Sequence, residues 1–176
     1  MRKRFGLLAG MILAGMAANV SAAQITEDDA KSIVLEAAGL EEKDVSFTRT
    51  KKDREDGRDI IEVEFYTEEK DEYDYEVIAE DGVILSASYE CTKPAADGKK
   101  VTLEQAKEAA AEHAGLDEDE ITFVKEKTGR DDGRTVHEIE FYTEDQKEYE
   151  YEIDADTGVI LSWDYDGEIY IRQQKK

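Results

Sequence analysis

The sequence is short of cysteine and proline, and the shortage of cysteine excludes a class of architecture. Its one cysteine, Cys91, cannot form an internal disulfide, so the chain is not a disulfide-stapled secreted domain. We expect a free thiol there, with an intermolecular disulfide as the alternative. The only proline, Pro94, lies in a short polar stretch. Each folded unit must therefore be held together by its own hydrophobic core.

Positive charge is also scarce. The chain has 23 Lys and Arg against 45 Asp and Glu, which gives a formal net charge of −22. Phosphate backbones and anionic membrane surfaces would repel such a chain. Nucleic acid is therefore excluded as an expected partner, whereas a basic protein surface or a cation remains a candidate.

Catalytic and metal-binding motifs are missing as well. The sequence contains no Gly-x-Ser-x-Gly, no phosphate-binding glycine loop and no His-Glu-x-x-His. Its two histidines, His113 and His137, fall on apolar sides of expected elements, where we predict buried structural roles. The segment Asp154–Gly158 starts like a calcium loop but lacks the later ligands, so we predict a hairpin turn. We predict a non-enzyme with no catalytic residues, no metal ligands and no cofactor.

A long apolar run occurs only at the N-terminus. The basic Arg2–Arg4 precedes the apolar Phe5–Ala18, and Val20–Ala22 offers small residues for cleavage. The run is shorter than the ~20 residues that span a bilayer. We predict a signal peptide at residues 1–22, with a retained anchor as the alternative. The mature chain is then expected outside the cytoplasm, secreted or in the cell envelope, with no stable membrane insertion after signal removal.

What the sequence has in abundance is self-similarity. Residues 25–90 align without a gap onto residues 101–166 at a constant offset of 76 positions. Such an internal repeat implies two copies of one small domain. The predicted parts after the signal are a first repeat at 23–90, a connector at 91–100, and a second repeat at 101–176 with an extra C-terminal strand near Glu168–Ile171.

Each repeat is predicted to open with an amphipathic helix. Thr26 and Thr102 fit N-caps that have a polar partner three residues later. Gly39 and Gly115 fit left-handed C-caps, and between cap and end the apolar residues recur with helical spacing.

After the helix the apolar period changes to two, which indicates four short strands separated by glycine turns. Short connections make consecutive strands antiparallel neighbours, with one face wet and the other covered by the helix. The predicted fold class is α+β, in two tandem copies of a helix packed on a four-stranded antiparallel meander sheet. We expect a separate sheet in each copy.

A surface for protein contact is predicted on the wet face. Tyr66 and Tyr142 lie on the strand face opposite the neighbouring phenylalanines, beside Glu64 and Glu140. If the helix covers the phenylalanine face, these four residues form an open partner-contact surface, for which tyrosine is well suited. The alternative is that the tyrosines only pack across strands within the sheet.

One pair of differences between the repeats predicts a packing compensation. Two larger side chains of the first helix are replaced by Ala109 and Ala110 in the second, whereas Ala87 is replaced by Trp163. Conserved core volume would place the Trp163 ring beneath the second helix.

The order of the motifs resembles that of a known family. The first repeat has Thr26–Ala30, Ala38–Leu40, Glu64–Tyr66, Tyr73–Val77 and Gly82–Leu85, and the second has the matching set from Thr102–Ala106 to Gly158–Leu161. Together they resemble the PepSY domain, and the resemblance covers nearly the whole mature chain.

The resemblance implies a function. PepSY domains occur in propeptides of thermolysin-like metallopeptidases and in exported bacterial proteins, and are thought to inhibit or regulate peptidases. It implies an exported, non-catalytic tandem PepSY protein that binds and inhibits or regulates an extracytoplasmic peptidase, acting in trans. The alternatives are a cell-envelope binding module that senses or sequesters a cation or small ligand, and a structural protein that self-associates, with Cys91 as one route.

Overall fold

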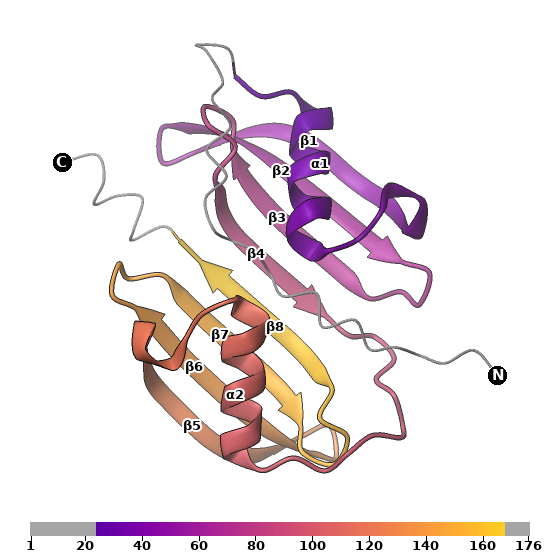
Figure 1. Cartoon of the computed structure of the whole chain (residues 1–176). Helices are drawn as coiled ribbons and strands as arrows, with labels where there is room; N and C mark the ends of the chain where they lie inside the picture. Colours follow the sequence, from indigo (N-terminus) through magenta and orange to yellow (C-terminus); the bar gives the residue numbers. More distant parts are fainter. Residues whose placement is uncertain (1–23, 168–176) are drawn as a thin grey trace.

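The computed structural model describes residues 24–167 and shows two halves with the same order of elements (Figure 1). The first half consists of α1 (Glu27–Ala38), β1 (Val45–Glu55), β2 (Arg58–Thr67), β3 (Glu72–Ile78) and β4 (Ile84–Glu90). The second half consists of α2 (Leu103–Ala114), β5 (Ile121–Asp131), β6 (Arg134–Thr143), β7 (Glu148–Asp154) and β8 (Ile160–Asp166). One-turn 3-10 helices, Glu42–Asp44 and Glu118–Glu120, precede β1 and β5. The predicted α+β fold is confirmed, while the predicted signal peptide at 1–22 and extra strand at 168–171 lie outside the described residues.

The helix ends are set by the residues that the sequence singles out. The Thr26 hydroxyl accepts a hydrogen bond from the Asp29 backbone N–H at 3.1 Å, and Thr102 accepts one from Gln105 at 3.3 Å. Each is a reciprocal capping box that satisfies otherwise unpaired N–H groups. Gly39 ends α1 in the left-handed region, with φ 65°.

Tight turns fix the pairing of the first two strands in each half. Asp132 and Gly133 connect β5 to β6 with φ of 43° and 82°, and the Asp-Gly pair between β1 and β2 has the same form. Two consecutive positive φ angles match the right-handed twist of paired strands. The hairpin register therefore follows from the local sequence.

The expectation of two separate sheets is wrong. Strand β4 pairs with β8 in antiparallel fashion, which joins the halves into one eight-stranded sheet of order β1-β2-β3-β4-β8-β7-β6-β5. Cys91 N–H donates to the Leu161 carbonyl at 2.7 Å, and Gly167 N–H donates to the Leu85 carbonyl at 2.9 Å, so the ladder continues at both ends. Merging satisfies two strand edges whose backbone groups would otherwise need water. We call the β4–β8 junction the seam.

Both helices cover the same face of this sheet, and one continuous core lies beneath them (Figure 1). Trp163 is 3% exposed and its ring centroid lies 5.7 Å from that of His113 on α2, so the predicted position beneath the second helix is confirmed. The indole also stacks on Tyr89 of the first half, at 6.1 Å. Within residues 24–167 no helix is long and apolar enough to cross a membrane.

Candidate partner-binding surface

Among residues 24–167, neither α1 nor α2 covers the second face of the sheet, and we call this the open face. Alternating carboxylates of the inner strands lie there, around a groove of about 470 Å³ that crosses the seam. The acidic residues that line it are Glu62, Glu64, Asp74, Glu76, Glu148, Glu150, Asp164 and Asp166. A single-sign surface of this kind attracts positively charged partners.

A second hollow extends the groove along the seam. It has a volume of about 720 Å³ and shares Asp74, Ser88 and Asp164 with the first. Asp131 and Asp132, at the tip of the β5–β6 hairpin, line it together with Glu90 and Cys91 of the first half. We call the two hollows together the acidic trough. Both halves are needed to form it.

Burial raises the pKa of several carboxylates in the trough, and for two of them nearby negative charges add to the effect. Burial raises the pKa of Asp164. Burial, then the charge of Glu64, raises the pKa of Asp74. Burial, then the charges of Glu140 and Glu148, raises the pKa of Glu150. A cation brought into the trough would relieve this mutual repulsion.

Positive charge is concentrated at the outer margins of the sheet. Arg49 on β1 forms ion pairs with Glu62 and Glu64, both at 2.9 Å. Lys125 and Lys127 on β5 both contact Glu138 at 2.9 Å. The sheet therefore carries compensated charge at its edges and a concentration of carboxylates at its centre.

All four residues predicted for partner contact lie on the two hairpin strands β2 and β6 and are partly exposed. The Lys70 ammonium lies 3.7 Å from the Tyr66 ring centroid. A hydrogen bond to Glu148 raises the pKa of Tyr142. The two predicted pairs belong to opposite halves, with β3, β4, β8 and β7 between them, so they do not form one cluster.

The structure shows that the candidate surface has a central part that the sequence did not predict. Asp74 and Asp164 lie between the predicted pairs, on β3 and β8. The alternation of these strands is visible in the sequence and places both residues on the open face. Their proximity depends on the seam, for which the sequence carries no local signal.

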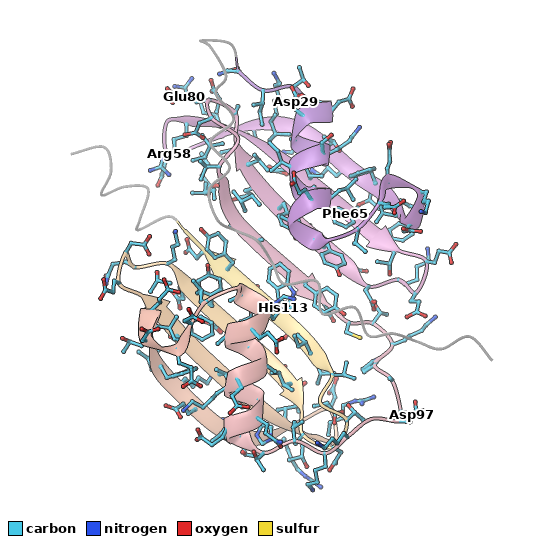
Figure 2. The ribbon with its side chains drawn as sticks, in the orientation of Figure 1. Asp29, Arg58, Phe65, Glu80, Asp97 and His113 are labelled. Atoms are coloured by element: carbon cyan, nitrogen blue, oxygen red, sulfur yellow. The ribbon has the colours of Figure 1, made fainter. Side chains whose placement is uncertain are left out.

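The two histidines have the structural surroundings that were predicted. His137 is 5% exposed, with Nδ1 2.9 Å from the Thr128 hydroxyl and Nε2 3.1 Å from the Val101 carbonyl. His113 Nδ1 lies 3.0 Å from the Tyr151 hydroxyl, on the side of α2 that faces the seam (Figure 2). Burial lowers the pKa of His113 to about 4.

Asp154 stabilises a turn, as predicted from its sequence context. One oxygen accepts the backbone N–H groups of Asp156 and Thr157 at 2.9 and 3.0 Å, and the other accepts from Arg134 at 2.9 Å. Burial opposes ionisation, but the bonds from Arg134 and the turn hold the pKa of Asp154 below its usual value. These contacts are those of a closed hairpin turn.

One carboxylate group on the open face has the spacing of cation ligands. Oxygens of Glu140, Glu148 and Glu150 lie within 4.8 Å of one another. Glu148 and Glu150 also line the acidic trough, so this group overlaps the candidate surface for a protein partner.

Comparison with known proteins finds one matching family and two similar sequences. The family profile described as "Peptidase propeptide and YPEB domain", PepSY, matches residues 100–164, in the second half. The uncharacterized protein YkoJ of Bacillus subtilis (strain 168) is 31% identical over 170 residues, covering 92% of this chain and 95% of YkoJ. The uncharacterized protein Spy1430 of Streptococcus pyogenes serotype M6 is 37% identical over 67 residues, which is 38% of this chain and 51% of that relative.

A solved structure agrees on architecture. The C-terminal domain of YpeB from Bacillus megaterium superposes with a TM-score of 0.54 at 11% identity, covering 86% of this chain and 66% of that one. At that identity the likeness concerns the fold alone. The profile match, the relative that spans nearly the full length and the repeated helix-on-meander unit agree, and the chain belongs to the PepSY family.

Proposed function

We propose that this protein is an exported, non-catalytic tandem PepSY protein that binds and restrains an extracytoplasmic peptidase. The observation that carries the proposal is the acidic trough, an uncovered surface that both halves build together. Family membership supports a peptidase as the target, because the family description joins PepSY to peptidase propeptides. The basic and apolar N-terminal residues support export.

The mechanism is steric and electrostatic. A basic rim of the peptidase docks on the trough, where it relieves the repulsion between Asp74 and Glu64 and between Glu150 and Asp164. Tyr66 on β2 and Tyr142 on β6 supply amphipathic contact area on either side of the trough. The rigid sheet then covers the substrate cleft, and no bond to the target is made.

Inhibition assays with matched charge variants test the proposal. Purified chain beginning at residue 23 is titrated into peptidases of the culture supernatant, and hydrolysis of a peptide substrate is followed. The variant Asp74→Asn/Asp164→Asn is expected to lose at least about tenfold in inhibitory potency, because two central charges disappear. The control Glu36→Gln/Glu112→Gln removes the same charge from exposed, equivalent positions of the two helices and should retain potency.

Two results would count against the proposal. One is a wild-type chain that inhibits no peptidase at micromolar concentration. The other is equal loss of potency in the trough variant and the helix variant, since that would assign the effect to net charge rather than to this surface. Potency that is insensitive to added salt would exclude the electrostatic part of the mechanism.

The alternative is a module that binds a cation, and the Glu140, Glu148 and Glu150 group favours it. Calorimetric titration with calcium separates the two functions, because only the cation module gives saturable heat. Glu148→Gln should abolish that heat, whereas Glu112→Gln should leave it unchanged.

A further inference from the structure

At the seam, each half contributes its last strand, β4 in the first half and β8 in the second, so equivalent edges of the two repeats are paired. Ser88 and Asp164 hold equivalent positions in the two repeats, and they face each other across β4 and β8. On either side, Ser86 faces Asp166 and Glu90 faces Ser162. Positions 86 and 162 are equivalent in the two repeats, and so are 90 and 166, so swapping the repeats exchanges these two pairs. The seam therefore has an approximate two-fold axis between Ser88 and Asp164, like the interface of a symmetric dimer. By backbone geometry alone, either edge could pair with a copy of itself from another chain.

On the open face the two edges differ in charge at the axis. The first half contributes the hydroxyl of Ser88 and the second half contributes the carboxylate of Asp164. Pairing of β8 with the β8 of a second chain would place two Asp164 carboxylates directly opposite each other, and like charges in that position are destabilising. The observed pairing has one carboxylate at the axis.

On the helix face the two edges differ in volume. Ala87 lies opposite Tyr165, and Tyr89 lies opposite Trp163. The Trp163 indole crosses the seam, stacking on Tyr89 at 6.1 Å and meeting Tyr75 edge-on at 6.4 Å. Pairing of β4 with β4 would leave the place of the indole empty, and pairing of β8 with β8 would have to fit two indoles. Cavities and overpacking both destabilise a core.

We propose that two pairs of equivalent positions, 87/163 and 88/164, determine which strand edges pair, so that β4 accepts β8 of the same chain and neither edge accepts a copy of itself. Ala87 and Ser88 form the small, uncharged side of this pair, and Trp163 and Asp164 form the large, charged side. The two differences select the pairing of unlike halves and exclude the dimer that two identical edges would form between chains.

The test uses the whole chain, cut once after folding. A protease recognition sequence is inserted between Ala96 and the exposed Asp97 of the connector (Figure 2), and the folded protein is nicked there. Dissociation of the halves on dilution is followed by the fluorescence of Trp163, the single tryptophan. Ser88→Asp should raise the dissociation constant roughly fivefold, because it creates a like-charge pair. Ser88→Asn should leave it unchanged, and Ser88→Asp/Asp164→Ser should restore it.

Equal effects of Ser88→Asp and Ser88→Asn, or failure of the double variant to restore affinity, would overturn the proposal. If the nicked chain stays associated at every dilution, the urea midpoint of the Trp163 signal provides the same comparison. Native mass spectrometry of the nicked wild type should show only unlike pairs and free halves. A statistical mixture of like and unlike pairs would also overturn it.

Discussion

Tyr75 and Tyr151 occupy the same position in the two halves but have different surroundings. The Tyr151 hydroxyl lies 3.0 Å from His113, whereas position 37, the equivalent of His113, is alanine. Among the described residues, the buried Tyr75 hydroxyl has no hydrogen-bond partner. An unsatisfied buried hydroxyl costs free energy.

Removing each hydroxyl should therefore have opposite consequences. Tyr75→Phe should leave the free energy of unfolding unchanged or raise it by up to about 1 kcal/mol, since nothing is lost but an unpaired group. Tyr151→Phe should lower it by about 1 kcal/mol, because His113 loses its partner. Urea unfolding of both variants provides the comparison. Equal destabilisation by the two changes would contradict this account.

His113 makes stability depend on pH. Burial lowers its pKa in the folded protein to about 4, below the ordinary value of 6.5, so between these values the unfolded chain binds more protons. Stability is therefore lost as the pH falls from 6.5 towards 4, by up to roughly 3 kcal/mol from this group. The unfolding free energies of wild type and His113→Gln, measured across that range, should converge in acid. A constant difference between them would exclude the effect.

At the scale of elements, the β5–β6 hairpin depends on one glycine more than on another. Gly133 has φ 82°, and a Cβ there would meet no atom within 4 Å, so only backbone strain opposes a side chain. Gly133→Ala should lower the unfolding free energy by roughly 1–2 kcal/mol. Gly129, in the same hairpin, has no positive φ and its Cβ would meet the flexible end of Glu138. Gly129→Ala is the control and should be nearly neutral, as thermal unfolding would show.

The elements were predictable because their signals are local. The capping threonines, the terminal glycines and the Asp-Gly turns each act within a few residues, and all of them have the predicted roles. The seam was not predictable, because a strand edge consists of backbone groups that look alike in every strand. The differences at positions 87 and 163 were interpreted only as compensation beneath the helix. Their contact across the halves is apparent only from the paired strands.

At the scale of the molecule, the candidate surface was only partly predictable, because the pairing of the two halves has no local signal in the sequence. Glu64, Tyr66, Glu140 and Tyr142 were assigned to the wet face from strand alternation, which needs one repeat only. The centre of the trough draws on both repeats, so its location depended on how they join.

The crowded trough should reduce stability at neutral pH. Because the pKa of Asp164 is raised by burial, the folded state disfavours its charge, and this cost disappears as the pH falls through the raised pKa. Asp164→Asn should raise the unfolding free energy at pH 7 by less than about 1 kcal/mol, given the solvent exposure of the site. The gain should vanish below pH 4. Calorimetric scans at both pH values would show it, and a gain that persists in acid would point to packing instead.

Among residues 24–167, the fusion of two meanders leaves β1 and β5, at the far ends of the ladder, each with a neighbouring strand on one side alone. Each is an 11-residue strand that could template a growing fibril. In a chain poor in cations, these margins carry Arg49, Lys51, Lys52 and Arg54 on one side and Lys125, Lys127 and Arg130 on the other. Several of these cations are held in ion pairs with neighbouring carboxylates, and charged side chains on an edge strand oppose the addition of a further strand. The two halves are thus able to pair at the centre of the sheet, while the outer strands oppose the addition of further strands.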